Sequence, residues 1–387
     1  MAKPKIRFKG YTDDWEQRKL GELYSILTER NTDLLPYNRT LSVATMTYKT
    51  DGNGAADSSL ANYKRLRIGD IAFEGHTSKE FRYGRFVLND AGDGIMSPRF
   101  SALRPYTQMP TTFWKYYIHY EPIMRKVLVN STKAGTMMNE LVVDEFLKSS
   151  LYVPSKEEQA CIGGYFTTLD HLITLHQRKC EETKKLKKYM LQKMFPQNGQ
   201  TVPEIRFVGF TDAWEQRKFS EGVSEIGDGL HGTPIYCEDG NVYFINGNNL
   251  VDGKIVISAE TKKVNESQQS TADKSLDDTT ILMSINGTIG NLAYYSGERL
   301  MLGKSAAYIK VSEFDKRFVY AYLQAPSVQG YFMDSLTGTT IKNLGLKAIR
   351  EMIMFIPQDV DEQKRIGKFF DYLDHLITLH QRKNIYF

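Results

Sequence analysis

Histidine next to aspartate is the most enzyme-like pattern in this sequence, and it occurs twice, as Asp170–His171 and Asp374–His375. A histidine paired with a carboxylate can act as a general base or as a metal ligand. A second histidine follows in each copy, His176 and His380, but its spacing of five residues lies off a single helical face. Because no third candidate ligand recurs with them, we interpret these histidines as helix-surface or helix-packing residues and predict no metal site.

The segment Gly297–Ser305, GERLMLGKS, is similar to a phosphate-binding loop. Five residues separate its first glycine from Gly-Lys-Ser, whereas that loop has four. A strand-like run, Ala306–Lys310, follows where the loop requires a helix. A two-lobed small-molecule enzyme with its phosphate site at Gly297–Ser305 therefore stays as one alternative hypothesis.

Other catalytic motifs are absent from the sequence. It contains no GxSxG nucleophile turn, no HExxH zinc motif and no Asn/Asp-Pro-Pro-Tyr tetrad of the kind used by amino-methyltransferases. The three cysteines, Cys161, Cys180 and Cys237, are scattered and form no CxxC pair, so neither a disulfide framework nor a zinc site is expected. We therefore predict a non-catalytic binding protein with no cofactor in this chain.

The sequence is internally duplicated. The eleven residues Leu169–Lys179 recur identically as Leu373–Lys383. Residues 4–20 match residues 203–219 at twelve of seventeen positions, including WEQRK. The segments 134–154 and 337–357 also align, with a shared Gly-Thr turn and a closing Pro, whereas the central parts, 24–130 and 223–334, are dissimilar. This pattern indicates one scaffold present twice, carrying two different central domains.

The sequence pattern of each central part is typical of a mixed α and β domain. Short strand-like runs such as Ile71–Phe73 and Arg85–Leu88 alternate with Gly/Asn/Asp turns. Helical spacing of apolar residues predicts helices over Thr112–Val129, with a break at Pro122, and over Phe318–Ala325. We therefore predict an α+β fold class.

Long helices are predicted after each mixed part. Ser155 with Glu158, and Asp359 with Glu362, have the spacing of a capping box at the helix start. Roughly 38 residues of the first helix would span about 57 Å. Apolar residues at coiled-coil spacing form a seam on each helix, namely Ile162, Phe166, Leu169 and Ile173 in the first copy and Ile366, Phe370, Leu373 and Ile377 in the second.

The two seams predict long antiparallel coiled-coil helices related by a pseudo-twofold axis. The second copy departs from the first after Lys383, so its helix is predicted to be truncated. The predicted division is a first mixed domain at 1–154, a central helical spacer at 155–198, a second mixed domain at 199–357 and a distal helix at 358–387.

Charge is unevenly distributed along the chain. The net charge of the whole sequence is +4, with +5 over residues 1–150 and −4 over residues 203–357. A polyanion partner is therefore possible for the first half, whereas the second half would need a local basic face. The sequence has no apolar run long enough to cross a membrane and no signal peptide, so we expect a cytoplasmic protein.

The repeated features resemble the specificity subunit of type I restriction–modification systems. They are the paired WEQRKL and WEQRKF segments, the Gly-Thr closing turns, the EEQ and DEQ helices with LDHLITLHQRK, and SINGTIGN at 284–291. The resemblance covers essentially the whole chain. It implies that each mixed domain is a target recognition domain that reads one half of a bipartite DNA site.

The same resemblance implies the partners. The helices would set the spacing and dock two modification subunits, which would bind S-adenosylmethionine and methylate adenine, and restriction/translocase subunits would join them. The alternative is a non-catalytic scaffold that holds partner subunits without reading DNA, and it predicts no salt-dependent affinity for duplex DNA.

Base and phosphate contacts require Arg, Lys, Asn, Gln, Ser, Thr or His in loops. In the first domain the polar loop candidates are Lys64, Arg65, Arg67, His76, Thr77, Lys79, Arg82, Arg85 and Arg99. In the second domain they are His231, Thr233, Asn286, Thr288, Lys304, Ser305, Lys342 and Asn343. Joint replacement of Arg82 and Arg85 is expected to weaken DNA binding by the assembled complex.

Overall fold

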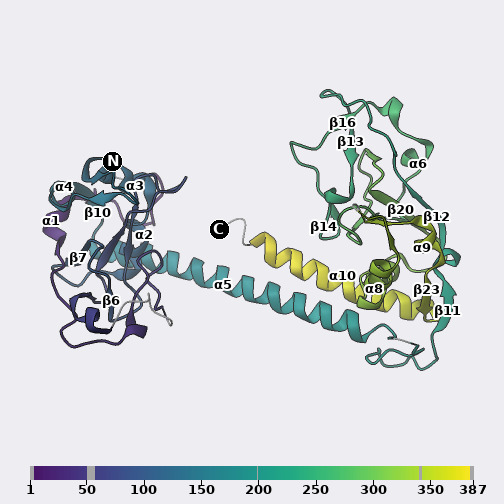
Figure 1. Cartoon of the computed structure of the whole chain (residues 1–387), viewed down its shortest axis with the longest axis horizontal. Helices are drawn as coiled ribbons and strands as arrows, with labels where there is room; N and C mark the ends of the chain where they lie inside the picture. The colour runs from purple at the N-terminus through teal and green to yellow at the C-terminus, as the bar shows by residue number, and fades with distance from the viewer. Residues whose placement is uncertain (1–3, 50–56, 198, 340–341, 384–387) are drawn as a thin grey trace. The chain divides into compact units, whose positions relative to one another are not determined.

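The structure is a computed structural model that describes residues 4–49, 57–197, 199–339 and 342–383. The chain divides into two compact units, Met1–Thr174 (unit 1) and Leu175–Phe387 (unit 2). Both units combine helices with mainly antiparallel sheets (Figure 1), which confirms the predicted α+β class. The boundary between the units falls inside one long helix, so each unit is described by itself.

Unit 1 is built around a four-stranded antiparallel sheet in the order β2-β7-β4-β5. Its elements are β1 (Glu16–Lys19), α1 (Leu20–Leu23), β2 (Tyr24–Ile26), the 3-10 helices η1 (Tyr37–Arg39) and η2 (Asp57–Asn62), β3 (Lys64–Leu66), β4 (Ile71–Glu74), β5 (Arg85–Leu88), β6 (Gly94–Met96), β7 (Ala102–Pro105), α2 (Thr111–Tyr117), α3 (Glu121–Ser131), β8 (Thr132–Lys133), β9 (Glu140–Leu141), α4 (Val143–Lys148), β10 (Ser150–Val153) and the first part of α5 (Lys156–Lys193).

The core of unit 1 lies between this sheet and helices α2, α3 and α4. Phe86 of β5 packs on Phe146 of α4 with ring centroids 4.5 Å apart, and Trp114 of α2 is almost fully buried. The predicted strands at Ile71 and Arg85 are confirmed as β4 and β5. The predicted break at Pro122 is also confirmed, because Pro122 lies in the first turn of α3, where its missing N–H costs no hydrogen bond.

Unit 2 repeats the four-stranded sheet in the order β12-β20-β17-β18 and adds a three-stranded sheet, β16-β13-β19. Its elements are the rest of α5, β11 (Glu215–Lys218), η3 (Phe219–Glu221), β12 (Val223–Asp228), β13 (Val242–Ile245), η4 (Gly247–Asn249), β14 (Leu250–Val251), β15 (Lys254–Ile255), β16 (Lys263–Val264), η5 (Glu266–Gln268), α6 (Thr271–Lys274), β17 (Thr280–Ser284), β18 (Leu292–Tyr294), β19 (Leu300–Leu302), β20 (Ala306–Val311), α7 (Lys316–Leu323), α8 (Pro326–Asp334), β21 (Leu336–Thr337), β22 (Asn343–Leu344), α9 (Leu346–Glu351), β23 (Ile353–Ile356) and α10 (Val360–Lys383).

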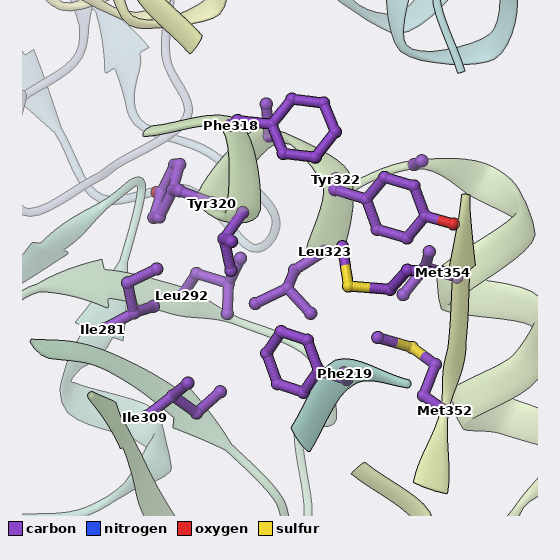
Figure 2. Packing of buried hydrophobic residues seen from close by; sticks show 14 of the residues in the cluster. Phe219, Ile281, Leu292, Ile309, Phe318, Tyr320, Tyr322, Leu323, Met352 and Met354 are labelled. Atoms are coloured by element: carbon purple, nitrogen blue, oxygen red, sulfur yellow. The ribbon is translucent and has the colours of Figure 1, made fainter. Parts of the chain in front are cut away.

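Aromatic and aliphatic side chains from these elements fill the core of unit 2. Figure 2 shows Phe219 below Leu323 of α7, with Ile281 of β17 on one side and Met352 on the other. Helix α7 confirms the helix predicted near Phe318–Ala325. Helix α7 is buried along nearly its whole length and packs on α10, the long helix that follows it in the chain.

The repeated segments perform the same structural task in both units. Strand β1 pairs antiparallel with β10 in unit 1, and β11 pairs antiparallel with β23 in unit 2. In each unit an arginine of the repeated segment that contains the Trp forms a bidentate ion pair with a buried glutamate in the first turn of the long helix. The N···O distances are 2.7–2.8 Å. These pairs are Arg7–Glu158 and Arg206–Glu362.

These ion pairs correct the predicted capping boxes. The Glu158 backbone N–H does donate to Ser155 Oγ at 3.3 Å, but the Glu158 carboxylate binds Arg7 instead of returning to the backbone of Ser155. At the second site Asp359 Oδ1 accepts from the backbone N–H of Asp361, and Glu362 binds Arg206. A glutamate at this spacing does stabilise the helix start, but its partner is an arginine far away in the sequence.

Helix α5 extends over 38 residues, which confirms its predicted length, and its unit 2 part packs antiparallel to α10 (Figure 1). His176 Nδ1 lies 3.1 Å from His380 Nδ1, and Lys187 Nζ lies 2.6 Å from Asp374 Oδ1, so the partner number falls as the α5 number rises. Phe195, just after α5, stacks on Phe370 with ring centroids 5.7 Å apart.

The two seams differ in what covers them. In α10, Ile366, Phe370 and Leu373 are buried in the core of unit 2, and Ile377 is half-buried. In α5 the matching residues are more open, since Phe166 is 41 % exposed, and Ile162, Leu169 and Ile173 are half-buried. The α10 seam thus packs mainly on α7 and on the end of α5.

Candidate nucleic-acid interface

The histidines of the repeat lie on the surface of the long helices or between them. His171 and His375 are exposed, and His176 and His380 contact each other between the helices. The described part of the chain brings together no set of three or more histidine, cysteine, aspartate or glutamate side chains suited to a metal ion. These positions agree with the helix-packing interpretation.

The phosphate-loop alternative has no structural support. Within Gly297–Ser305, residues 300–302 form β19, and the backbone N–H of Gly303 donates to the carbonyl of Ile245 at 2.8 Å. The backbone N–H of Lys304 donates to the carbonyl of Leu230 at 2.9 Å. Backbone donors that would have to face a phosphate are therefore already bonded within the protein.

Three loops of unit 1 meet beyond the end of β4, and we call them the edge loops of unit 1: residues 75–84, 97–101 and 134–139. The backbone N–H of Asn139 donates to the carbonyl of Gly75 at 2.9 Å, and Arg99 Nη2 lies 3.9 Å from Met137 Sδ. A Cβ at Gly75 would lie 2.1 Å from the carbonyl oxygen of Asn139, so only glycine permits this approach.

Five predicted residues of unit 1 lie on these loops. His76, Thr77, Lys79, Arg82 and Arg99 are exposed. Within the described ranges, the side chains of Thr77, Lys79 and Arg82 make no hydrogen bond or ion pair, so their donors are available to another molecule. The edge loops of unit 1 are therefore a basic surface suited to phosphate contact.

Arg85 is held partly within the fold, at the start of β5. Its Nη2 donates to the carbonyl of Ala44 at 3.4 Å, and its guanidinium carbon lies 4.9 Å from the centroid of the Phe81 ring. Its Nε is 3.7 Å from Glu74 Oε2. Arg85 therefore borders the edge loops but is less available than Arg82.

The side chains of the remaining three predicted residues of unit 1 are bonded within the domain, and their role as DNA contacts stays a prediction. Lys64 Nζ donates to the carbonyl of Phe100 at 2.6 Å, and burial lowers its pKa. Arg65 is 6 % exposed and bonds Asp93 at 3.0 Å. Arg67 forms a bidentate pair with Glu29.

Unit 2 brings equivalent loops together, and we call them the edge loops of unit 2: residues 285–291, 303–305, and 338–339 with 342–343. The backbone N–H of Leu344 donates to the carbonyl of Ile285 at 2.9 Å, and Asn286 Nδ2 donates to the carbonyl of Lys304 at 3.3 Å. In both units the first of these loops follows the same strand of the four-stranded sheet, β4 or β17, and the last belongs to the closing turn.

The predicted residues of unit 2 separate into exposed and structural groups. Thr288, Lys304 and Lys342 are exposed on the edge loops, and Asn286 and Asn343 are half-buried beside them. His231 and Thr233 are exposed and lie in the connection between β12 and β13. The ring of His231 contacts Asp228 Oδ2 at 2.8 Å. Ser305 Oγ donates to Asn246 Oδ1 and accepts from the backbone N–H of Gly247, so its hydroxyl is already bonded within the domain.

Sequence reasoning missed Glu74, which ends β4 beneath the edge loops of unit 1. It is 6 % exposed, and its carboxylate accepts a hydrogen bond from the His76 backbone N–H at 3.0 Å. The available signal was a carboxylate at the end of the apolar run Ile71–Phe73, where a buried strand would otherwise continue.

A membrane-crossing helix would need a length and apolarity that none of the described helices combines.

Residues 214–385 match the family model of the type I restriction modification DNA specificity domain. Over 409 aligned residues the chain is 21 % identical to the "Putative type I restriction enzyme MjaX specificity subunit" of Methanocaldococcus jannaschii, covering 96 % of this chain and 89 % of that protein. The fold is similar to the crystal structure of a type I restriction–modification S subunit from M. genitalium, with a TM-score of 0.58, 13 % identity and coverage of 98 % and 94 %. It is also similar to the HsdS subunit from Thermoanaerobacter tengcongensis, with a TM-score of 0.50, 17 % identity and coverage of 96 % and 91 %.

Proposed function

We propose, from the premise that this chain belongs to the specificity subunits of type I restriction–modification systems, that each unit reads one half of a bipartite DNA site through its edge loops. Such a subunit is not itself an enzyme. It selects the DNA site at which other subunits of the complex act.

One observation carries the proposal. The edge loops occur at equivalent places in two copies of one scaffold, yet their side chains differ. Unit 1 presents Lys79, Arg82 and Arg99 there, whereas unit 2 presents Thr288 and Lys304. A common scaffold gives both readers the same support, and different side chains allow them to recognise different bases.

The long helices support a spacing and docking role. Helix α5 runs from one unit into the other as a single element, and Phe166 on its first-copy seam remains 41 % exposed. We infer that the helices set the distance between the half-sites and bind two modification subunits, which carry S-adenosylmethionine and transfer the methyl group to adenine. Restriction/translocase subunits complete the complex.

Exchange of residues 24–130 for the corresponding part of another specificity subunit tests this function. The assembled methyltransferase complex is expressed in cells, and methylated adenines are mapped by sequencing. We expect one half of the methylation site to change and the other half and the spacer to stay the same.

Exchange of residues 223–334 is the matched control and should change only the opposite half. Change in both halves after either exchange would contradict the modular assignment. Methylation of an unchanged site after both exchanges would favour the scaffold alternative, in which the chain holds its partners without reading DNA.

A further inference from the structure

A hollow of about 190 Å³ lies next to the edge loops of unit 1. Its walls include the apolar side chains of Leu41, Val43, Met96 and Phe100, and the charged or polar residues Glu74, His76 and Lys49 also line it. The volume is below the roughly 300–1,000 Å³ of typical small-molecule pockets, so the hollow suits one small group rather than a large ligand.

Glu74 provides an open hydrogen-bond acceptor in this hollow. Its Oε1 accepts from the His76 backbone N–H at 3.0 Å and contacts the His76 ring. Its Oε2 forms an ion pair with Arg85 Nε at 3.7 Å but makes no hydrogen bond to any described residue. A carboxylate of a residue that is only 6 % exposed is normally satisfied by donors.

Arg85 compensates the charge of Glu74 without occupying its acceptor sites. The Nε of Arg85 is buried and has no hydrogen-bond partner, and its Nη2 donates to the carbonyl of Ala44. Its guanidinium lies against the ring of Phe81. The guanidinium of Arg85 therefore compensates the negative charge of the Glu74 carboxylate, while Oε2 can still accept a hydrogen bond from an N–H donor.

The surroundings identify the class of donor. Lys79 and Arg82 are exposed on the adjoining loop, where they suit a phosphate backbone. A nucleobase is attached to that backbone and has both apolar faces and, in some bases, an amino group. In base readout, acidic side chains accept hydrogen bonds from the amino group of cytosine. Because Glu74 is buried, the base has to enter the hollow to reach it, as bases do when proteins bind them outside the stack.

We propose that Glu74 is a specificity-determining residue of unit 1, whose Oε2 accepts a hydrogen bond from the exocyclic amino group of a cytosine or adenine that enters the hollow. This inference rests on the proposed function and adds the base chemistry to it. Unit 2 differs at this place, since β17 ends at Ser284, whose Oγ accepts from the backbone N–H of Asn291 at 2.9 Å. The two units would therefore discriminate bases by different chemistry.

The test compares Glu74→Gln with Glu80→Gln in the full complex, using the mapped methylation sites as the readout. Glu74→Gln keeps the size of the side chain and replaces one acceptor by a donor. Preference at one position in the unit 1 half-site should fall by on the order of tenfold or more, or shift to another base, while the unit 2 half-site stays unchanged. Glu80 is exposed on the same loop, so Glu80→Gln controls for the lost charge and should leave the site unchanged.

A second variant, Ser97→Trp, fills the hollow without altering Glu74. We expect it to reduce binding of the cognate duplex much more than binding of an unrelated duplex, with a melting curve like that of the wild type. Unchanged base preference in both variants would overturn the proposal. So would an equal loss of cognate and unrelated binding by folded Glu74→Gln protein, because Glu74 would then act only as a structural partner of Arg85.

The proposed function would survive such a failure. It depends on exchange of residues 24–130 changing one half of the site, whereas the role of Glu74 depends on a single position within that half.

Discussion

At the scale of the residue, basic side chains of unit 1 with the same chemistry have two different roles. Lys79 and Arg82 are exposed and unpaired within the described ranges, whereas Arg65 and Arg67 form ion pairs inside the domain. Only an unpaired cation can exchange counterions for a DNA phosphate without first breaking an internal bond. Within the described ranges, the unpaired basic side chains Lys79 and Arg82 of the predicted set therefore lie on the edge loops of unit 1.

Replacement of Lys79 and Arg82 by alanine should weaken DNA binding by the complex with little change in stability. Each lost phosphate contact reduces the slope of log Kobs against log salt by about 0.9, so we expect a fall of up to about two. The measurement is a salt titration of duplex binding. Lys126→Ala, an exposed cation on α3 outside the edge loops, is the control, and an equal effect there would count against a specific role for the loops.

The carboxylate of Glu29 should make the stability of the folded protein depend on pH in the acidic range. Hydrogen bonds from Arg67 and then from Arg104 lower its pKa from 4.5 to about 2, against the effect of burial. A depressed pKa in the folded state gives stabilisation that is present above pH 4.5 and is lost as pH falls toward 2. The melting temperature of wild type should therefore exceed that of Glu29→Gln at pH 6, and the gap should shrink at pH 3. A gap independent of pH would exclude this ion pair as its source, and Glu80→Gln should show no such trend.

At the scale of the element, one glycine in each long helix allows the helix to approach its own domain. A Cβ at Gly163 would lie 2.7 Å from the backbone N of Phe113 at the start of α2. A Cβ at Gly367 would lie 2.7 Å from the backbone N of Phe318 in α7. The two glycines occupy equivalent positions of the repeat, so the same close contact orients both helices.

Gly163→Ala and Gly164→Ala should have opposite effects, although the two residues are adjacent in α5. A methyl group at Gly163 meets backbone and should destabilise unit 1 by about 1–3 kcal/mol, whereas Gly164 has nothing within 4 Å. Gly164→Ala should instead stabilise the helix by roughly 0.5–1 kcal/mol. Thermal unfolding followed by circular dichroism measures both, and effects of the same sign would contradict the close-packing argument.

At the scale of the whole molecule, two units with separate hydrophobic cores carry separate edge loops. The cluster around Phe86 belongs to unit 1, and the cluster around Phe318 belongs to unit 2. Binding contributions from the two sets of loops should therefore be independent, because each set is supported by the hydrophobic core of its own unit.

Additivity measures this independence. Lys79→Ala with Arg82→Ala in unit 1, and Lys304→Ala with Lys342→Ala in unit 2, should each reduce DNA affinity. When all four changes are combined, the two losses of binding free energy should add within about 0.5 kcal/mol. A much larger deviation in the affinity of the fully assembled complex would indicate that the two units do not read DNA as independent modules.

The sequence by itself determined the duplication, the α+β class, the long helices and the absence of a complete catalytic motif. These features follow from repeated sequence segments and from the local periodicity of apolar residues. The same local signals predicted strands β4 and β5 and the helix break at Pro122. Apolar spacing along a segment depends only on which face of that segment is buried, so it can be read without the rest of the chain.

Only the tertiary structure decided which charges are free and which groups face the hollow. Arg65 and Arg82 look equally suitable in sequence, but Arg65 is buried against Asp93, and Arg82 is exposed on an edge loop. The carboxylate of Glu158 binds Arg7 instead of the backbone of Ser155, which was its predicted partner. The carboxylate of Glu74 is distinguished only by its burial beside Arg85. The electrostatic role of a side chain depends on partners far away in sequence and on local burial, and folding alone brings these together.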